Sequence, residues 1–215
     1  MIIAIDGTLA SGKGTIARRL SGWYGLAHMD TGRLYRATGV AALNKGVDFA
    51  DPNALAEVAR CLDLNDYSED QLRSAEAGQA ASKVAAVPEV RSALLDLQRA
   101  FAHQSKGAVL DGRDIGTVVC PDADVKLWID ATVQVRATRR WKELTEKGET
   151  LTLDEMIEQL KERDERDRRR EDAPMIAAAD SVLIDTSELT IDAAVDKARA
   201  AVDAVLAQKS DRSEP

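Results

Sequence analysis

The most constraining feature of the chain is a short apolar segment that runs directly into a glycine-rich loop. Residues 2–15 read Ile-Ile-Ala-Ile-Asp-Gly-Thr-Leu-Ala-Ser-Gly-Lys-Gly-Thr. Gly7 and Gly12 allow the loop to curl so that successive backbone amides point inward, and a helix beginning near Lys13 adds the positive end of its dipole. A strand, a loop and a helix in this order predict a phosphate-binding loop (P-loop) within an α/β fold.

The loop also predicts which residues contact a polyphosphate. Lys13 would reach the outer phosphates, and Thr15 the region of the phosphates and a magnesium ion. Gly14 occupies the position where the P-loop pattern has a hydroxyl residue, so direct metal coordination by Thr15 stays open. The alternative is a glycine-rich turn with a solvated lysine. The residues expected to bind the donor phosphates are Gly7, Thr8, Leu9, Ala10, Ser11, Gly12, Lys13, Gly14 and Thr15.

Apolar runs and helical periodicity predict the rest of the architecture. Buried strands are expected at residues 2–5, 108–110, 125–129 and 182–184, and helices at 13–24, 34–44, 53–62, 89–104, 132–147, 153–170 and 191–206. Strands separated by helices form a parallel sheet flanked by helices, and ligands bind beyond the carboxyl ends of its strands. The segments 6–7, 111–114 and 185–187 follow three of the runs, so we expect them to converge.

Composition and charge limit the class of protein. The 215 residues suffice for one domain, and a net charge of −8 argues against a nucleic-acid-binding surface. No apolar run is long enough to span a bilayer and there is no signal-peptide pattern, so we expect a cytoplasmic monomer without a membrane partner. Residues 209–215 are expected to form a frayed polar tail. Packing or surface roles rather than metal binding are expected for Cys61, Cys120, His28 and His103.

The segment 28–36 carries two arginines after a helix-capping pair. Arg33 and Arg36 lie three residues apart on one helical face, behind Asp30 and Thr31. Taken alone, this spacing favours an ordinary capped helix with surface arginines. Beside a P-loop it indicates a site for a second phosphate, because the guanidinium fork binds phosphate in a bidentate manner.

The segment 111–117 combines two carboxylates with glycines. Asp111 follows a buried run that faces the P-loop, so it is the candidate holder of magnesium or of its water shell. Asp114 offers only acceptors when ionised and could recognise an amino group on a base. The alternative is a polar turn with an internal ion pair between Arg113 and Asp114.

The segment 162–170 is densely charged. Opposite charges recur at i, i+4 throughout it, which fits a solvated helix with surface ion pairs. However, Arg163, Asp167 and Arg170 form one stripe that would place two guanidinium groups around a carboxylate. A second basic cluster precedes it at Arg136, Arg139 and Arg140. This layout indicates a mobile lid that bears arginines.

Together these four segments resemble the bacterial cytidylate kinases, which are P-loop nucleoside monophosphate kinases. The similarity covers nearly the whole chain in the same order and continues through residues 185–187. It implies a single P-loop kinase domain over 1–215, with an acceptor-binding region at about 31–105 and a lid at about 139–170. It also implies magnesium-dependent transfer of the γ-phosphoryl group of ATP to CMP or dCMP.

The resemblance extends to individual residues. Lys13, Arg163 and Arg170 would stabilise charge on the transferred group. Asp114 and Arg91 would recognise the amino group and the ring acceptor of cytosine, which predicts a preference for CMP over UMP. The implied acceptor site consists of Thr31, Arg36, Ser82, Arg91, Arg113, Asp114, Arg163, Asp167 and Arg170. Many family members carry a small β-rich insertion that looks truncated here at 62–73.

Other functions stay open at this point. Another P-loop small-molecule kinase, such as an adenylate or shikimate kinase, would share the loop but not the later segments. A non-catalytic nucleotide-binding switch would not need two basic acceptor segments. A structural protein would leave the P-loop unexplained.

Overall fold

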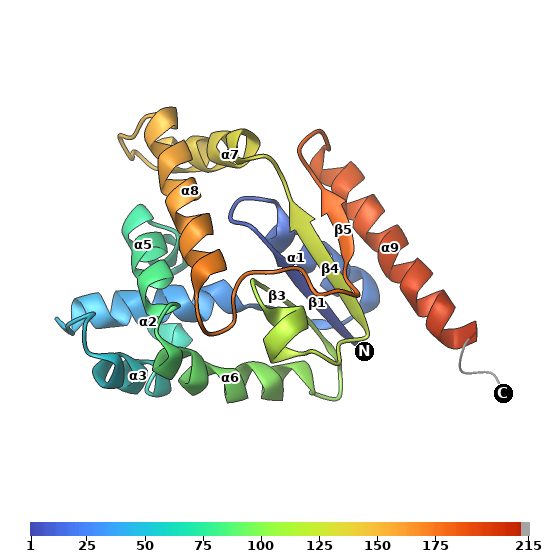
Figure 1. Cartoon of the computed structure of the whole chain (residues 1–215), viewed down its shortest axis with the longest axis horizontal. Helices are drawn as coiled ribbons and strands as arrows, with labels where there is room; N and C mark the ends of the chain where they lie inside the picture. The colour runs from blue at the N-terminus through green and yellow to red at the C-terminus, as the bar shows by residue number, and fades with distance from the viewer. Residues whose placement is uncertain (212–215) are drawn as a thin grey trace.

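A computed structural model describes residues 1–211 and contains a five-stranded parallel sheet with helices on both faces (Figure 1). The strands are β1 (Ile2–Gly7), β2 (Ala27–Asp30), β3 (Ala108–Gly112), β4 (Val125–Asp130) and β5 (Val182–Asp185). Their order is β2-β3-β1-β4-β5, so β1 is central and pairs in parallel with both β3 and β4. The predicted α/β fold is confirmed, and the loop after β1 leaves the sheet between its two neighbours.

The helices fall into groups around the sheet. They are α1 (Lys13–Tyr24), α2 (Thr31–Asn44), α3 (Pro52–Arg60), α4 (Glu69–Leu72), α5 (Ala75–Val84), α6 (Pro88–Ala102), α7 (Val133–Thr145), α8 (Leu153–Arg169) and α9 (Ile191–Asp211). Helices α1 and α9 pack against one face of the sheet. Helices α2, α3, α5 and α6 share a second core, and α7 packs on α8 in a third. In Figure 1, α7 and α8 stand above and to the left of the sheet, and α9 lies to its right.

The alternation of side chains along β1 explains why it lies at the centre. Ile3 and Ile5 point into the core beneath α1 and α9, whereas Ala4 points into the core on the other face. All three side chains are completely buried. A strand that is apolar on both faces is stable only between two helical layers.

The helix boundaries follow local signals. The Asp30 carboxylate accepts a hydrogen bond from the Arg33 backbone amide and caps α2, as the sequence predicted. Thr152 and Glu155 form a capping box that begins α8. Gly25, in the left-handed conformation, ends α1.

Three elements differ from the sequence-based expectation. β2 was not predicted, because it is a short edge strand whose four residues are all only partly buried. Helices α4 and α5 were also not predicted. α5 is made largely of alanine and small polar residues, which give weak periodicity, and α4 has only four residues. Within 62–73 the structure has a short helical turn and α4 but no strand.

Helix α9 is longer than predicted. It continues to Asp211 instead of ending at 206, so the expected frayed tail is wrong for the backbone of 209–211. Residues 212–215 of that predicted tail lie outside the described residues. Within 1–211, no helix combines the length and apolarity needed to cross a membrane.

Candidate active site

The loop between β1 and α1 turns sharply at three residues whose backbone has positive φ angles. At Gly7 the φ angle is 150°, and a Cβ there would lie 1.8 Å from the backbone oxygen of Ile129 in β4. Only glycine therefore fits where the loop passes β4. Ala10 and Gly12 also have positive φ angles, of 61° and 92°. These turns curl the chain back on itself before α1 begins at Lys13.

Side chains from the carboxyl ends of β4 and β5 brace this loop. The Thr8 hydroxyl donates to Asp130 at 2.5 Å, and the Thr186 hydroxyl donates to the Ser11 carbonyl at 2.8 Å. Arg139 donates to both the hydroxyl and the carbonyl oxygen of Thr186, at 3.1 and 2.8 Å. The end of the fifth strand thus meets the P-loop, as the predicted parallel sheet requires.

Lys13 is the half-buried cation of the loop. Its ammonium group donates to the Thr8 carbonyl at 3.2 Å. Burial, helped by the nearby Arg113, lowers the pKa of Lys13 to about 7, although Asp111 and Asp30 act in the opposite direction. A multiply charged anion bound here would stabilise the protonated form.

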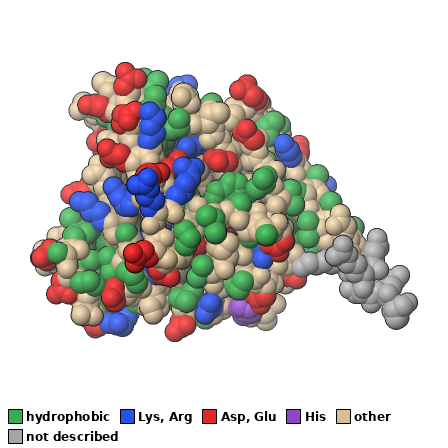
Figure 2. All heavy atoms as spheres, viewed as in Figure 1, with side chains coloured by type: hydrophobic (Ala, Val, Ile, Leu, Met, Phe, Trp, Pro, Cys, Tyr) green, Lys and Arg blue, Asp and Glu red, His purple; other side chains and the backbone are tan. Residues whose placement is uncertain are grey.

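A pocket beside Lys13 brings together side chains from distant segments. It is lined by Lys13, Asp111 and by every residue predicted for the acceptor site: Thr31, Arg36, Ser82, Arg91, Arg113, Asp114, Arg163, Asp167 and Arg170. These residues come from α1, α2, α5, α6, from β3 and the turn after it, and from α8 and its C-cap. Lys and Arg side chains gather on this part of the surface, over α8 (Figure 2).

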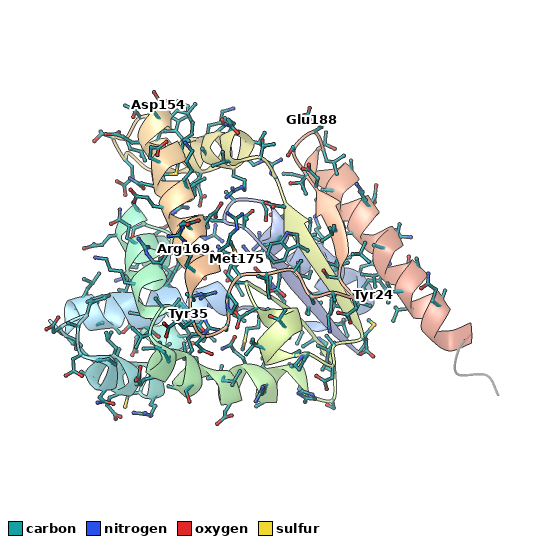
Figure 3. The ribbon with its side chains drawn as sticks, in the orientation of Figure 1. Tyr24, Tyr35, Asp154, Arg169, Met175 and Glu188 are labelled. Atoms are coloured by element: carbon teal, nitrogen blue, oxygen red, sulfur yellow. The ribbon has the colours of Figure 1, made fainter. Side chains whose placement is uncertain are left out.

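One end of the pocket is built on a buried ion pair. Arg91 donates to the Asp114 carboxylate, and both side chains are 7% exposed. Burial raises the pKa of Asp114 even though Arg91 and Arg170 oppose this shift. The Arg91 guanidinium also lies 5.7 Å from the centre of the Tyr35 ring, and Tyr35 points toward the C-terminal end of α8 (Figure 3). Asp114 therefore does not pair with Arg113, which rules out the internal ion pair considered from the sequence.

The other end of the pocket is surrounded by guanidinium groups. Arg113 donates to the Gly7 carbonyl at 2.8 Å and to the Asp167 carboxylate at 3.2 Å. Burial would raise the pKa of Asp167, but Arg113, Arg163 and Arg170 hold it below its usual value. Burial and Arg113 lower the pKa of Arg163 to about 10, which leaves this guanidinium protonated at neutral pH.

Helix α8 has a solvated face, but two of its charged residues are buried on other faces. Asp164 and Asp167 are each 4% exposed. Asp164 accepts two hydrogen bonds from Arg136, which also donates to the Ala131 carbonyl at 2.9 Å. Arg136 thus joins α7 to α8 and does not line the pocket. Of the other residues in its cluster, Arg139 braces the P-loop and Arg140 pairs with Glu143.

A second cavity, of about 460 Å³, lies on the opposite side of the P-loop. Thr15, Arg139 and Thr186 contribute polar groups to it, and Leu189 and Ile191 contribute apolar surface. A polyphosphate on the P-loop would therefore have a pocket at each end. Such an arrangement suits two nucleotides that share one phosphate-binding loop.

The comparisons with known proteins agree with this geometry. The sequence model described as cytidylate kinase matches residues 3–204. The chain belongs to the cytidylate kinase family. It is 56% identical to the cytidylate kinase of Cereibacter sphaeroides, over 96% of this chain and 97% of that one. It is 51% identical to the cytidylate kinase of a Caulobacter species, over 96% of each chain.

Solved structures share the fold of this cytidylate kinase family member at low sequence identity. A gluconokinase from Sinorhizobium meliloti superimposes with a TM-score of 0.54 at 13% identity, covering 99% of this chain and 97% of that one. An uncharacterised protein from Eubacterium ventriosum gives a TM-score of 0.52 at 15% identity, covering 94% and 98%. At this identity the likeness shows the fold alone.

One of the two histidines, for which a packing or surface role was expected, contacts the candidate metal-site carboxylate. His28, in β2, lies 2.8 Å from Asp111 Oδ2 through its Nε2. The Asp111 side chain is 5% exposed, and its other oxygen lies beside Gly14 of the P-loop helix. Thr15, the other candidate, lines the second cavity, and its hydroxyl accepts from Arg18 at 3.3 Å. Asp111 thus lines the first pocket and Thr15 the second.

Asp6 is a site-supporting residue that the sequence analysis did not assign. Its carboxylate accepts hydrogen bonds from the backbone amides of Ile115 and Gly116, at 2.8 and 2.7 Å. Burial raises the pKa of Asp6 to about 7 against the effect of these two bonds. The contact fixes the turn that carries Arg113 and Asp114. A carboxylate at the end of an otherwise apolar strand was the signal that could have identified it.

Proposed function

We propose that this chain transfers the γ-phosphoryl group of ATP to CMP or dCMP, with magnesium, to give ADP and CDP or dCDP. The observation that carries the proposal is that one pocket beside Lys13 contains all nine residues expected for the acceptor nucleotide. Membership of the cytidylate kinase family supports the choice of cytidine nucleotides.

ATP would occupy the P-loop and the 460 Å³ cavity beyond it. The backbone of residues 7–15 and the start of α1 would hold the phosphates, because this helix end presents free amides and a positive dipole. Leu189 and Ile191 offer apolar surface to the base, and Arg139 fixes the loop through Thr186.

The acceptor would lie with its base at the pair of Arg91 and Asp114. Cytosine presents an amino donor and an adjacent ring acceptor, which match a carboxylate acceptor and a guanidinium donor. Uracil reverses both groups, so it would place a carbonyl oxygen against the Asp114 carboxylate and an N–H group against the Arg91 guanidinium. Arg36 and Arg113 would bind the acceptor phosphate, and Thr31 lines the same pocket.

Transfer would need positioning and charge neutralisation but no covalent intermediate on the protein. The acceptor phosphate is already a nucleophile at neutral pH, and in-line placement removes most of the entropic barrier. Lys13, Arg163 and Arg170 supply the positive charge around the transferring group. An arginine in this role accelerates related phosphoryl transfers by about 10³–10⁵-fold.

The residues present fit a magnesium ion that is bound mainly by phosphate and water. No group of three or more His, Cys, Asp or Glu side chains within residues 1–211 could form a protein cage for a metal. Mg²⁺ is commonly held by one or two carboxylates together with substrate phosphates. Asp111 would supply that carboxylate, directly or through water, and His28 would orient it. A bound Mg²⁺ would neutralise charge on the ATP phosphates.

The proposal is tested by measuring ADP formation from ATP and Mg²⁺ with CMP, dCMP, UMP, AMP, GMP and shikimate as acceptors. CMP and dCMP should give the highest kcat/KM. A higher value with UMP, AMP or shikimate would assign a different acceptor. If no acceptor supports ADP formation, the chain is not a kinase for these substrates, and a non-catalytic nucleotide-binding role would replace the proposal.

A further inference from the structure

Helix α8 contacts α5 through three guanidinium groups at regular intervals. Arg163 donates to the Gly78 carbonyl at 3.0 Å, and Arg170 donates to the Ala85 carbonyl at 3.3 Å. Between them, Arg166 donates to the Ser82 hydroxyl at 2.7 Å. The three acceptors are spaced i, i+4 and i+7, so they lie on one face of α5. Arg163 and Arg170 belong to the proposed transfer site, which leaves Arg166 without an assigned task.

The position of Ser82 makes its contact with Arg166 informative. Ser82 is 2% exposed and lines both the nucleotide pocket and a neighbouring cavity of about 180 Å³ between α5, α7 and α8. Arg166 lines only the neighbouring cavity. It therefore reaches the nucleotide pocket from outside, through Ser82.

The hydrogen bond between Arg166 and Ser82 can have only one direction. A guanidinium group donates but does not accept, so the Ser82 oxygen is the acceptor. This is the only side-chain hydrogen bond of Ser82 among the described residues. A serine hydroxyl otherwise rotates freely, and the bond to Arg166 restricts that rotation. The hydroxyl hydrogen and the second lone pair remain available to a ligand in the pocket.

The alternative role for Arg166 was a surface ion pair with Glu162. No such pair occurs among the described residues, where the i, i+4 ion pairs of α8 are Arg163 with Asp167 and Arg169 with Glu165. The side chain is directed toward α5 instead. A solvated-helix role does not account for this contact.

We propose that Arg166 is a positioning residue for the acceptor base. By holding the Ser82 hydroxyl, it orients that group in the nucleotide pocket and couples binding of the acceptor to the placement of α8. This inference rests on the proposed function, because it requires that the pocket binds CMP.

The test compares Arg166→Leu with the matched variant Arg168→Leu. Arg168 lies on the same helix, is exposed, and has no hydrogen bond or ion pair among the described residues. Both changes remove one positive charge, but only the first removes the bond to Ser82. The affinity for CMP is measured by calorimetry without ATP, and kcat and KM are measured for CMP, UMP and ATP.

We expect Arg166→Leu to weaken CMP binding by about tenfold, which is the size expected for loss of a hydrogen bond from a charged donor. The preference for CMP over UMP should fall, and KM for ATP should change by less than about twofold. Arg168→Leu should match the wild type. Arg166→Lys, which retains a charged donor, should recover part of the affinity. Should the leucine variant fail to fold, Arg166→Gln provides the same comparison.

A double-mutant cycle separates action through Ser82 from a general effect of charge. In the Ser82→Ala background, Arg166→Leu should weaken CMP binding by less than about twofold. A full tenfold loss in that background, or equal behaviour of the Arg166 and Arg168 variants, would overturn the inference. If either result is found and the wild type still phosphorylates CMP, only the inference about Arg166 is overturned. A wild type that does not phosphorylate CMP would overturn the proposed function as well.

Discussion

Burial acts in opposite directions on the pKa values of two charged residues, Lys13 in the pocket and Asp6 at the end of β1. It lowers the pKa of Lys13 to about 7 and raises the pKa of Asp6 to about 7. Each group is therefore near its midpoint at neutral pH when the pocket holds no ligand. Binding of a polyphosphate changes this balance, because negative charge stabilises the ammonium form of Lys13.

We predict that ATP binding at pH 8 takes up a proton. In the free protein Lys13 is mostly neutral at this pH, and the bound phosphates raise its pKa above 8. The uptake should decrease toward pH 6, where Lys13 is already protonated. Calorimetry in two buffers of different ionisation enthalpy measures the protons exchanged. Lys13→Met should abolish the uptake, and an unchanged value in this variant would assign the proton to another group such as Asp6.

A second prediction concerns the choice of base. Asp114→Ala removes the acceptor for the cytosine amino group and leaves Arg91 buried without its main partner. Loss of such a contact costs about 1–3 kcal/mol, so the ratio of kcat/KM for CMP and UMP should fall by roughly 5- to 150-fold. ATP affinity, measured separately, should change little. An unchanged ratio would remove Asp114 from base recognition.

At the scale of elements, one face of α8 lines the nucleotide pocket and another face anchors the helix to α7. One face, with Arg163, Asp167 and Arg170, lines the nucleotide pocket. Another face is anchored to α7 through the buried pair of Asp164 and Arg136. The pocket-lining arginines are held in place because a neighbouring face of the helix is fixed by a buried ion pair and by the shared α7–α8 core.

We predict that Arg136→Met destabilises the protein by about 3–5 kcal/mol, because it leaves the Asp164 carboxylate buried without a counter-charge. Urea unfolding measures the change. The double variant Arg136→Met with Asp164→Leu should recover most of the loss, since it buries no charge. A double variant as unstable as the single one would contradict this explanation.

The arginines of α8 should also differ in their effect on turnover. Arg170→Ala should lower kcat or the affinity for CMP by at least about tenfold, because it removes a charged donor from the pocket. Arg168→Ala, which removes a guanidinium outside this pocket, should have little effect. Steady-state kinetics with both substrates checks this difference, and equal small changes would support the solvated-helix interpretation.

The elements differ in how well the sequence predicts them. The strands β1, β3 and β5 have continuous apolar runs, and only Lys126 interrupts the run of β4. Helix α1 matches its predicted range of 13–24. β2 has only two apolar residues among four, because an edge strand is partly solvated. α5 has weak periodicity because alanines pack it closely against α2, where a Cβ on Gly39 would lie 2.7 Å from the Ala80 side chain. Tertiary packing rather than local pattern defines these two elements.

At the scale of the whole molecule, the sequence predicted which residues meet but not how they pair. Parallel strands place the ends of β1, β3 and β5 at one edge, so convergence followed from topology. The pairings of Arg91 with Asp114, Arg113 with Asp167, and His28 with Asp111 join residues 23, 54 and 83 positions apart. No local spacing carries such information. The division into acceptor and lid regions stays a prediction, because it concerns motion.

The central position of β1 has a consequence for the order in which the protein is made. Ile2 pairs with Ala108 on one side, and Ile3 pairs with Val125 on the other. At a synthesis rate of about 5–20 residues per second, β1 leaves the ribosome roughly 5–25 seconds before both of its neighbours are available. During that time it has two unpaired edges, which are prone to association with other chains. The phosphate-binding loop therefore takes shape only after more than half of the chain has been translated, and nucleotide cannot assist the earlier stages of folding.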